Sequence, residues 1–187
     1  MEIKAIFDEI TAESSTNQKM EILKKYKDNE LLKRVLYLAN SKRVKFFIKQ
    51  IPYYSPNGGH SLEMALLGLD ALITRKVTGS EATAYLKSLL TSLSSEDAYI
   101  LERIIEKDCK IGMGTTFMNK VMKDLIEDTP YMGAISFDEK KARKIFEKGG
   151  KGISQIKMDG RYCNAVIRGG EVEMESRQGE PTILTGA

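Results

Sequence analysis

The hydrophobic pattern of this chain changes from helical to strand-like across a glycine-rich joint at residues 149–152. Before the joint, apolar residues recur every three or four positions, which is typical of amphipathic helices; the first such stripe is Ile3, Ile6, Phe7 and Ile10. After it, residues 153–159 alternate in a β-rich run that predicts a strand. Helices and strands that are segregated along the chain predict an α+β protein.

The helical part contains several recognisable start and stop signals. Ser15-Thr-Asn-Gln18 is a capping box, and Asn29 is the expected cap of the next helix. Pro52, Pro56 and two glycines predict a loop over residues 51–61. Ser80 and Ser95 are the expected caps of two later helices, and Ser136 opens another capping box. The expected helices span about 16–26, 42–50, 62–74, 81–92 and 96–108. A further helix is expected after Asn29, with apolar residues from Leu31 to Leu38, and two more end near 125 and near 148.

A break at Pro130 separates the two patterns. We expect a helical domain over residues 1–130, a linker with one helix over 131–152, and an incomplete β-containing domain over 153–187.

Composition excludes several classes of protein. The chain has 187 residues, with 42% hydrophobic and 29% charged residues, which is typical of a soluble globular protein. No apolar run approaches the length of a membrane span, and the N-terminus lacks the pattern of a signal peptide. Cys109 and Cys163 lie far apart and are expected to be free thiols. A single histidine, His60, excludes a histidine-based metal cluster, and we assign it no role.

Positive charge is concentrated between Lys19 and Lys49, where ten lysines and arginines face three acidic residues. A basic block of this kind is the electrostatic signature of a polyanion site. It is equally compatible with lysine-rich solvent faces of ordinary helices.

A lysine, a carboxylate and an arginine cluster around the predicted hairpin. Lys157 and Asp159 fall on one face of the predicted strand, and Gly160 allows a close turn. The strand resumes at Tyr162, reverses at Gly169-Gly170 and returns through residues 171–177, which end with Arg177. These residues suit a covalent nucleotidyltransferase, in which lysine is the nucleophile. The alternative is a solvated edge hairpin without a catalytic role.

A second candidate site precedes the short helix at about 115–125. Two glycines before a threonine-capped helix allow backbone N–H groups to converge on a phosphate. The sequence does not match a nucleotide-binding P-loop, so a nucleic-acid backbone is the better ligand. The alternative is a glycine cap between two helices. The residues of this candidate phosphate site are Lys110, Gly112, Gly114, Thr115, Asn119 and Lys120.

Taken together, these segments resemble the ATP-dependent DNA ligases of tailed bacteriophages, the T-even type in particular. The resemblance covers essentially the whole chain in order, through residues 27–35, 74–79 and 103–120, Asp138-Glu-Lys, the Lys157-x-Asp-Gly motif and Ser176-Arg177. It implies a helical DNA-binding domain followed by the first hairpin of an adenylation domain.

The resemblance also implies the chemistry. Lys157 would carry AMP from ATP, with Mg²⁺ as the metal, and nicked duplex DNA would be the substrate in replication, repair and recombination. The implied nucleotide-binding residues are Gln155, Ile156, Asp159, Arg161 and Arg177. No metal ligand is expected within this chain. We further expect a monomer without membrane contact, located in the cytoplasm of the host cell if a phage encodes it.

Two departures from the family pattern limit these expectations. The arginine expected five residues after Lys157 is replaced by Tyr162, and the arginine stands one residue earlier as Arg161, which leaves its role open. The later family motifs are absent before Ala187, so we expect this chain alone to be inactive.

Three alternatives remain. The first is a non-catalytic DNA-binding module formed by the helical domain. An RNA ligase or a capping guanylyltransferase would share the Lys-x-Asp-Gly motif, but the long helical domain ahead of it argues against both.

Overall fold

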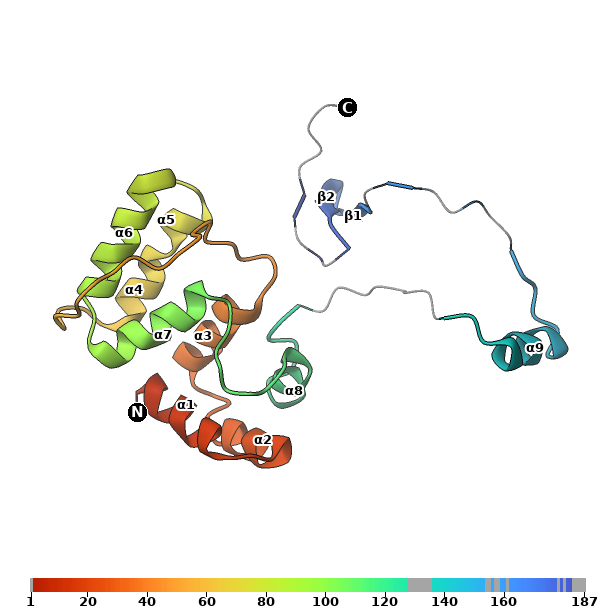
Figure 1. The fold of residues 1–187 in the computed structure, drawn as a ribbon, viewed down its shortest axis with the longest axis horizontal. Helices are drawn as coiled ribbons and strands as arrows, with labels where there is room; N and C mark the ends of the chain where they lie inside the picture. Colours follow the sequence, from red (N-terminus) through yellow and green to blue (C-terminus); the bar gives the residue numbers. More distant parts are fainter. Residues whose placement is uncertain are drawn as a thin grey trace. The chain divides into compact units, whose positions relative to one another are not determined.

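The structure is a computed structural model that describes residues 2–127, 136–153, 156, 159–160, 162–177, 179 and 181–182. The chain divides into two compact units, Met1–Glu127 and Asp128–Ala187. Figure 1 traces both units along the chain, and each is described here by itself.

Unit 1 is a helical bundle organised around α7. This helix contacts α1, α3, α4 and α6, and it buries six of its eleven residues (Figure 1). The hydrophobic core runs from Ile3 to Ile126. Because this core is continuous across the unit, unit 1 has the burial that an independent domain needs. Its helices are α1 (Ile3–Ala12), α2 (Thr16–Lys25), α3 (Glu30–Asn40), α4 (Leu62–Gly68), α5 (Asp70–Ile73), α6 (Gly79–Thr91), α7 (Ser95–Ile105) and α8 (Thr115–Val121).

Two of the predicted helix caps lie where the sequence placed them. Asn29 caps α3 by accepting a hydrogen bond from the backbone N–H of Leu32 at 3.0 Å. Ser15 occupies the cap position of α2 but accepts no hydrogen bond from that helix through its side chain.

Three other predicted caps were wrong by one or two residues. The helices begin after Thr78, Ser94 and Asp138 instead of at Ser80, Ser95 and Ser136. The Ser94 hydroxyl accepts from the N–H of Asp97 at 3.1 Å, and the Asp138 carboxylate accepts from that of Lys141 at 3.0 Å. A cap residue must keep extended backbone angles, and where two polar residues stand nearby the sequence alone does not show which one does so.

The basic helix predicted over residues 42–50 does not form. Val44 and Phe46 are buried, whereas Phe47 is 58% exposed and has a φ of 57°. Apolar burial at every second residue suits an extended chain, and the left-handed angle at Phe47 is incompatible with a helix. The loop predicted over residues 51–61 is confirmed, and its Gly58 and Gly59 N–H groups donate to the carbonyls of Leu93 and Ser92.

Several predicted helices in unit 1 end earlier than expected. The helix predicted over 62–74 is divided at Leu69 into α4 and α5. The next long helix, α7, ends at Ile105 instead of 108, because Lys107 adopts a left-handed φ of 59°. Beyond it, α8 ends at Val121, and Asp124 has a φ of 56°. A residue with left-handed backbone angles ends a helix. Such a position can be predicted reliably from the sequence only when the residue is glycine.

Unit 2 contains α9 (Glu139–Glu147) and an antiparallel hairpin of β1 (Asn164–Arg168) and β2 (Glu171–Glu175). The predicted reversal at Gly169-Gly170 is confirmed, with φ values of 58° and 88° that match a type I′ turn. The strands are shorter than predicted, since β1 begins after Tyr162 and β2 ends before Arg177.

The strand predicted over residues 153–159 is not seen at the positions that the structure describes. Ile153, Ile156 and Asp159 are all outside β-strands, and the first two are 92% and 87% exposed. The nucleophile candidate Lys157 lies outside the described residues.

The hairpin presents an exposed apolar face. Ile167 pairs with Val172, and their side chains are 70% and 59% exposed. Helix α9 buries none of its residues. A two-stranded hairpin is only marginally stable without a partner surface, so this face is suited to further burial. Within the described ranges, no helix has both the length and the apolar character of a membrane span.

Candidate functional site

The Ser176-Arg177 motif lies in a tight turn directly after β2. The Gly179 N–H donates to the Ser176 carbonyl at 2.9 Å, and the Thr182 N–H donates to the Met174 carbonyl at 2.7 Å. The chain therefore folds back against β2, with a bridge between Glu175 and Pro181. This turn fixes the backbone of Arg177, whose side chain is exposed.

The other predicted nucleotide-binding residues are described only in part. Ile156 and Asp159 are exposed and lie between the joint and β1. Gln155, Lys157 and Arg161 lie outside the described residues. The arrangement of these five side chains around a nucleotide thus stays a prediction.

In unit 1, the Gly112 loop is fixed by a lysine that the sequence did not single out. Lys19 of α2 is 8% exposed, and its Nζ donates to the Ile111 carbonyl at 2.7 Å. Gly112 has a φ of 62°, and a β-carbon there would lie 2.6 Å from the Lys19 Nζ. Lys19 shares the apolar face of α2 with Ile22 and Leu23, three and four residues on, and this spacing is the signal that could have identified it.

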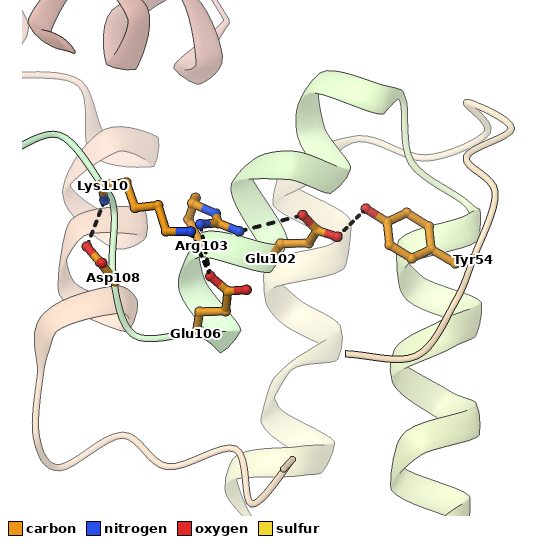
Figure 2. Close-up of polar contacts among 6 residues, drawn as sticks. All are labelled: Tyr54, Glu102, Arg103, Glu106, Asp108 and Lys110. Atoms are coloured by element: carbon orange, nitrogen blue, oxygen red, sulfur yellow. Dashed lines mark hydrogen bonds and ion pairs between the residues drawn. The ribbon is translucent and has the colours of Figure 1, made fainter. Parts of the chain in front are cut away.

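Lys110 belongs to an ion-pair cluster at the end of α7 (Figure 2). Its backbone N–H donates to the Asp108 carboxylate at 2.8 Å, and its Nζ lies 3.6 Å from the Glu106 carboxylate. Glu106 also pairs with Arg103 at 2.9 Å. The charge of Lys110 is therefore partly neutralised by Glu106, which weakens it as a phosphate ligand.

The same cluster holds the connection between α3 and α4 against α7. The Tyr54 hydroxyl donates to the Glu102 carboxylate at 2.8 Å, and Glu102 lies 3.8 Å from Arg103 (Figure 2). Burial, and then the hydrogen bond to Glu102, raise the pKa of Tyr54 well above its ordinary value. Arg103 is 6% exposed, and its Nε has no hydrogen-bond partner among the described residues.

Asn119 serves the turn that follows α8. Its amide nitrogen donates to the Ile126 carbonyl at 2.8 Å, and its amide oxygen accepts from the Ile126 N–H at 3.0 Å. This pair of hydrogen bonds closes the segment that leads out of unit 1. Asn119 therefore has a structural role here, whatever else it contacts.

The remaining residues of the candidate phosphate site are accessible. Gly114 is the N-cap of α8 and gives it no side-chain cap, and Thr115 begins this seven-residue helix. Lys120 is exposed, with its Nζ 5.0 Å from the centre of the Phe117 ring. The structure thus brings Gly112, Gly114 and Thr115 together in one loop, with Lys120 on the helix that follows.

The basic block between Lys19 and Lys49 is divided into paired and unpaired charges. Lys24, Lys25 and Lys33 pair with Glu21, Glu9 and Glu30, respectively. Lys49 has no carboxylate partner among the described residues. Among all the residues that the structure describes, no group of three or more histidine, cysteine or acidic side chains could hold a metal ion.

Comparison with solved structures identifies the fold. Two solved chains, titled Pmar-Lig_PreS3 and Pmar-Lig_Pre., superpose with TM-scores of 0.70 and 0.71. Each alignment covers 95% of this chain and 42% of the solved chain, and the aligned sequences are 21% identical.

The sequence itself is similar to curated phage enzymes. Over 179 residues it is 36% identical to the DNA ligase of Enterobacteria phage T4, and equally to that of phage T6. These matches cover 91% of this chain and 36% of each relative. The chain is therefore similar to one part of these phage DNA ligases and spans about a third of their length, in line with the resemblance that its motifs indicated. No family model matches it.

Proposed function

We propose that this chain is the DNA-binding and nucleophile-bearing part of an ATP-dependent DNA ligase that seals nicks in duplex DNA. The observation that carries the proposal is the 36% identity to the T4 and T6 DNA ligases over 91% of the chain. In a phage, this activity would serve replication, repair and recombination in the cytoplasm of the host cell. The proposed protein acts as a monomer.

Lys157 is the proposed nucleophile. Its neutral amine attacks the α-phosphorus of ATP, a P–N bond forms, the P–O bond to pyrophosphate breaks, and the amine loses a proton. Because a free lysine has a pKa of about 10.4, the site must favour the neutral amine. Asp159 opposes this by stabilising the ammonium, so nearby positive charge has to outweigh it.

The nucleotide then passes to DNA in two further displacements. An oxygen of the 5′-phosphate at the nick attacks the phosphorus of the bound AMP, and the P–N bond to Lys157 breaks. The 3′-hydroxyl next attacks the 5′-phosphate, which closes the strand and releases AMP. Arg177 suits contact with either phosphate, because its guanidinium is always charged and its backbone is fixed by the turn at Ser176.

The nucleotide site requires more surface than the described part of unit 2 supplies. Exposed Ile156 is apolar and suited to the adenine ring, and Arg161 and Gln155 complete the proposed set. Mg²⁺ would supply charge neutralisation on the phosphates. The apolar face of the hairpin, at Ile167 and Val172, is uncovered. We therefore expect a competent site only where further protein covers this face.

The proposed contact with the DNA backbone is the loop before α8 together with Lys120. Gly112, Gly114 and Thr115 offer backbone groups, and Lys120 offers an exposed charge. Lys110 contributes less, because Glu106 lies 3.6 Å from its ammonium. Contacts of this kind position a protein on DNA without reading sequence.

A chimera tests the proposed activity. Residues 1–187 replace the matching segment of the phage T4 DNA ligase, and sealing of a labelled nicked duplex is measured with ATP and Mg²⁺. We expect sealing by the chimera and none after Lys157→Arg, whereas Lys151→Arg, at a nearby exposed lysine, leaves it unchanged. Sealing that survives Lys157→Arg would refute the assigned nucleophile.

A second candidate function is a DNA-binding module that works without Lys157. The observation in its favour is that, among the residues that the structure describes, the hydrophobic core lies between Ile3 and Ile126. This reading predicts that residues 1–127 alone bind nicked duplex DNA as tightly as residues 1–187. A clear loss of affinity on removing unit 2 would count against it.

A further inference from the structure

The extended connection between α3 and α4 is drawn in orange in Figure 1. It carries two exposed aromatic side chains. Phe47 is 58% exposed and Tyr53 is 90% exposed. Both line one hollow of about 600 Å³, which also contacts Gly79 and Thr83 of α6. A hollow of this volume is in the range that holds a small ligand or one nucleotide unit.

The charge around this hollow is positive. Lys49 lines it, and no acidic residue is among the described residues that do so. The Arg75 guanidinium lies 5.0 Å from the centre of the Phe47 ring, where it adds a second cation beside the same aromatic side chain. The hollow therefore suits a ligand that combines a planar apolar group with an anion.

A neighbouring hollow shows the opposite character. It has a volume of about 690 Å³ and shares Ile48 to Ile51 with the first, but Glu106 and Asp108 form its other wall. These two carboxylates disfavour an anionic ligand. Of these two hollows, only the one lined by Phe47 and Tyr53 combines exposed aromatic rings with positive charge.

The backbone is strained at Phe47 and at Arg75, the two residues whose side chains are in contact beside the hollow. Phe47 and Arg75 have φ values of 57° each, in the left-handed region that bulky residues rarely adopt. The two residues that stack on each other thus both hold unfavourable backbone angles. Strain of this kind persists where the surrounding structure fixes it, and it is concentrated at ligand-binding sites.

We propose that this hollow binds an unpaired nucleotide of a single-stranded nucleic acid. The base stacks against Phe47 and Tyr53, and the phosphate contacts Lys49. Stacking tolerates any base because every base has a π-face, so the site would prefer unpaired over paired strands without reading sequence. None of the residues that line this hollow belongs to the loop before α8, and the inference does not depend on the proposed ligase activity.

The test is fluorescence anisotropy of a labelled oligothymidylate of about 12 nucleotides, with the 187-residue chain as the titrant. Phe47→Ala and Tyr53→Ala are each expected to weaken binding about tenfold. Lys49→Ala is expected to weaken binding and to lower the salt dependence by about one phosphate contact. The matched controls are Phe137→Ala and Lys87→Ala, at an exposed phenylalanine and an exposed lysine elsewhere in the chain.

One further variant and a set of competition measurements separate loss of stacking from loss of stability. Phe47→Gly relieves the left-handed strain, so its melting temperature should equal or exceed that of the unmodified chain while binding is still lost. An oligouridylate should compete as the oligothymidylate does if the base face is what binds, and a duplex of the same length should compete poorly.

Each opposite result overturns the proposal. Unchanged affinity of Phe47→Gly or Tyr53→Ala would exclude stacking. Equal competition by the duplex would reduce the site to general electrostatic attraction. A loss confined to Lys49→Ala would lead to the same conclusion.

Discussion

The Lys19 ammonium of α2 occupies the space that a side chain on Gly112 would need. A β-carbon at Gly112 would lie 2.6 Å from the Lys19 Nζ, which is itself hydrogen-bonded to the Ile111 carbonyl at 2.7 Å. Glycine is therefore favoured at position 112 for two reasons, its φ of 62° and this close approach. The relationship ties the loop before α8 to a helix more than 80 residues earlier in the chain.

Replacement of Gly112 by alanine should destabilise unit 1 more than the same change at Gly58. Both glycines have left-handed φ values, but a β-carbon at Gly58 meets nothing within 4 Å. Gly58→Ala should cost about 1 kcal/mol through its backbone angle alone. Gly112→Ala should cost about 1 kcal/mol more, because it displaces the buried hydrogen bond of Lys19. Urea denaturation measures both changes.

A Lys19→Met background supplies the control for this prediction. With the ammonium removed, Gly112→Ala and Gly58→Ala should have similar effects on the free energy of unfolding. An unchanged excess cost at Gly112 in that background would show that Lys19 is not its cause.

Lys107 should make the stability of unit 1 rise in mildly alkaline solution. Its Nζ donates to the carbonyls of Leu38 at 2.7 Å and Ser41 at 2.6 Å, and burial lowers its pKa to about 8. Between pH 8 and the ordinary value of 10.5, the unfolded chain binds more protons than the folded one. The penalty for burying the charge is therefore relieved as pH rises through this window.

Comparison with Lys107→Met isolates this contribution. The difference in free energy of unfolding between the unmodified chain and the variant should grow from pH 8 to pH 10, as measured by chemical denaturation. Lys87→Met, at an exposed lysine, should show no such trend. A difference that stays flat or shrinks with pH would contradict the assigned burial of the Lys107 charge.

Glu127 should stabilise the C-terminal end of unit 1 only while its carboxylate is ionised. Its carboxylate accepts from the Tyr37 hydroxyl at 2.8 Å and from the Ser41 hydroxyl at 2.9 Å. Burial opposes the charge, but these hydrogen bonds outweigh it and lower the pKa of Glu127 below 4.5. The stabilisation is thus present above pH 4.5 and lost as pH falls through the lowered pKa.

The variant Glu127→Gln measures this effect. Its deficit in melting temperature relative to the unmodified chain should be present at pH 6 and should fade toward pH 3. Glu63→Gln, at an exposed glutamate of α4, should show no comparable trend. A deficit of constant size at both pH values would show that charge on Glu127 is not what stabilises the contact.

Lys120 should contribute more to DNA binding than Lys110. Lys120 is exposed and stacks on Phe117, whereas the Lys110 ammonium is shared with Glu106. Lys120→Ala should weaken binding to nicked duplex and reduce the salt slope by about one, while Lys110→Ala has a smaller effect. Binding titrations at several salt concentrations measure both slopes, with Lys87→Ala as the reference. Equal slopes for Lys120→Ala and the reference would remove this loop from the proposed interface.

The features that the sequence predicted well depend on local signals. The Asn29 cap and the Gly169-Gly170 turn are each set by the backbone preference of one or two residues, and both are confirmed. The helix predicted over 42–50 failed because Phe46, Phe47 and Ile48 are consecutive, so their pattern fits a helix as well as an extended chain. Tertiary contacts, with Phe46 buried and Phe47 stacked on Arg75, decided between them.

In the candidate site too, locally encoded features could be predicted from the sequence and features set by long-range contacts could not. The turn of the hairpin before Arg177 is encoded locally and could be predicted, although β2 ends at Glu175, two residues before Arg177. The spacing of Lys19 with Ile22 and Leu23 could have placed it on the buried face of α2, but its partner Ile111 lies far along the chain and could not be predicted from local signals. The pairing of Lys110 with Glu106 spans four residues of sequence, yet it depends on the left-handed turn at Lys107 and Lys110. Long-range contacts and left-handed residues are what sequence patterns describe least well.

The measurement that tests the central claim most directly is intact-mass analysis of the chimera described above after incubation with ATP and Mg²⁺. The account predicts a covalent gain of one AMP, mapped by peptide analysis to Lys157 and absent in the Lys157→Arg variant. A folded chimera that gains no AMP, or gains it at another residue, while the T4 ligase gains one under the same conditions, would contradict the account.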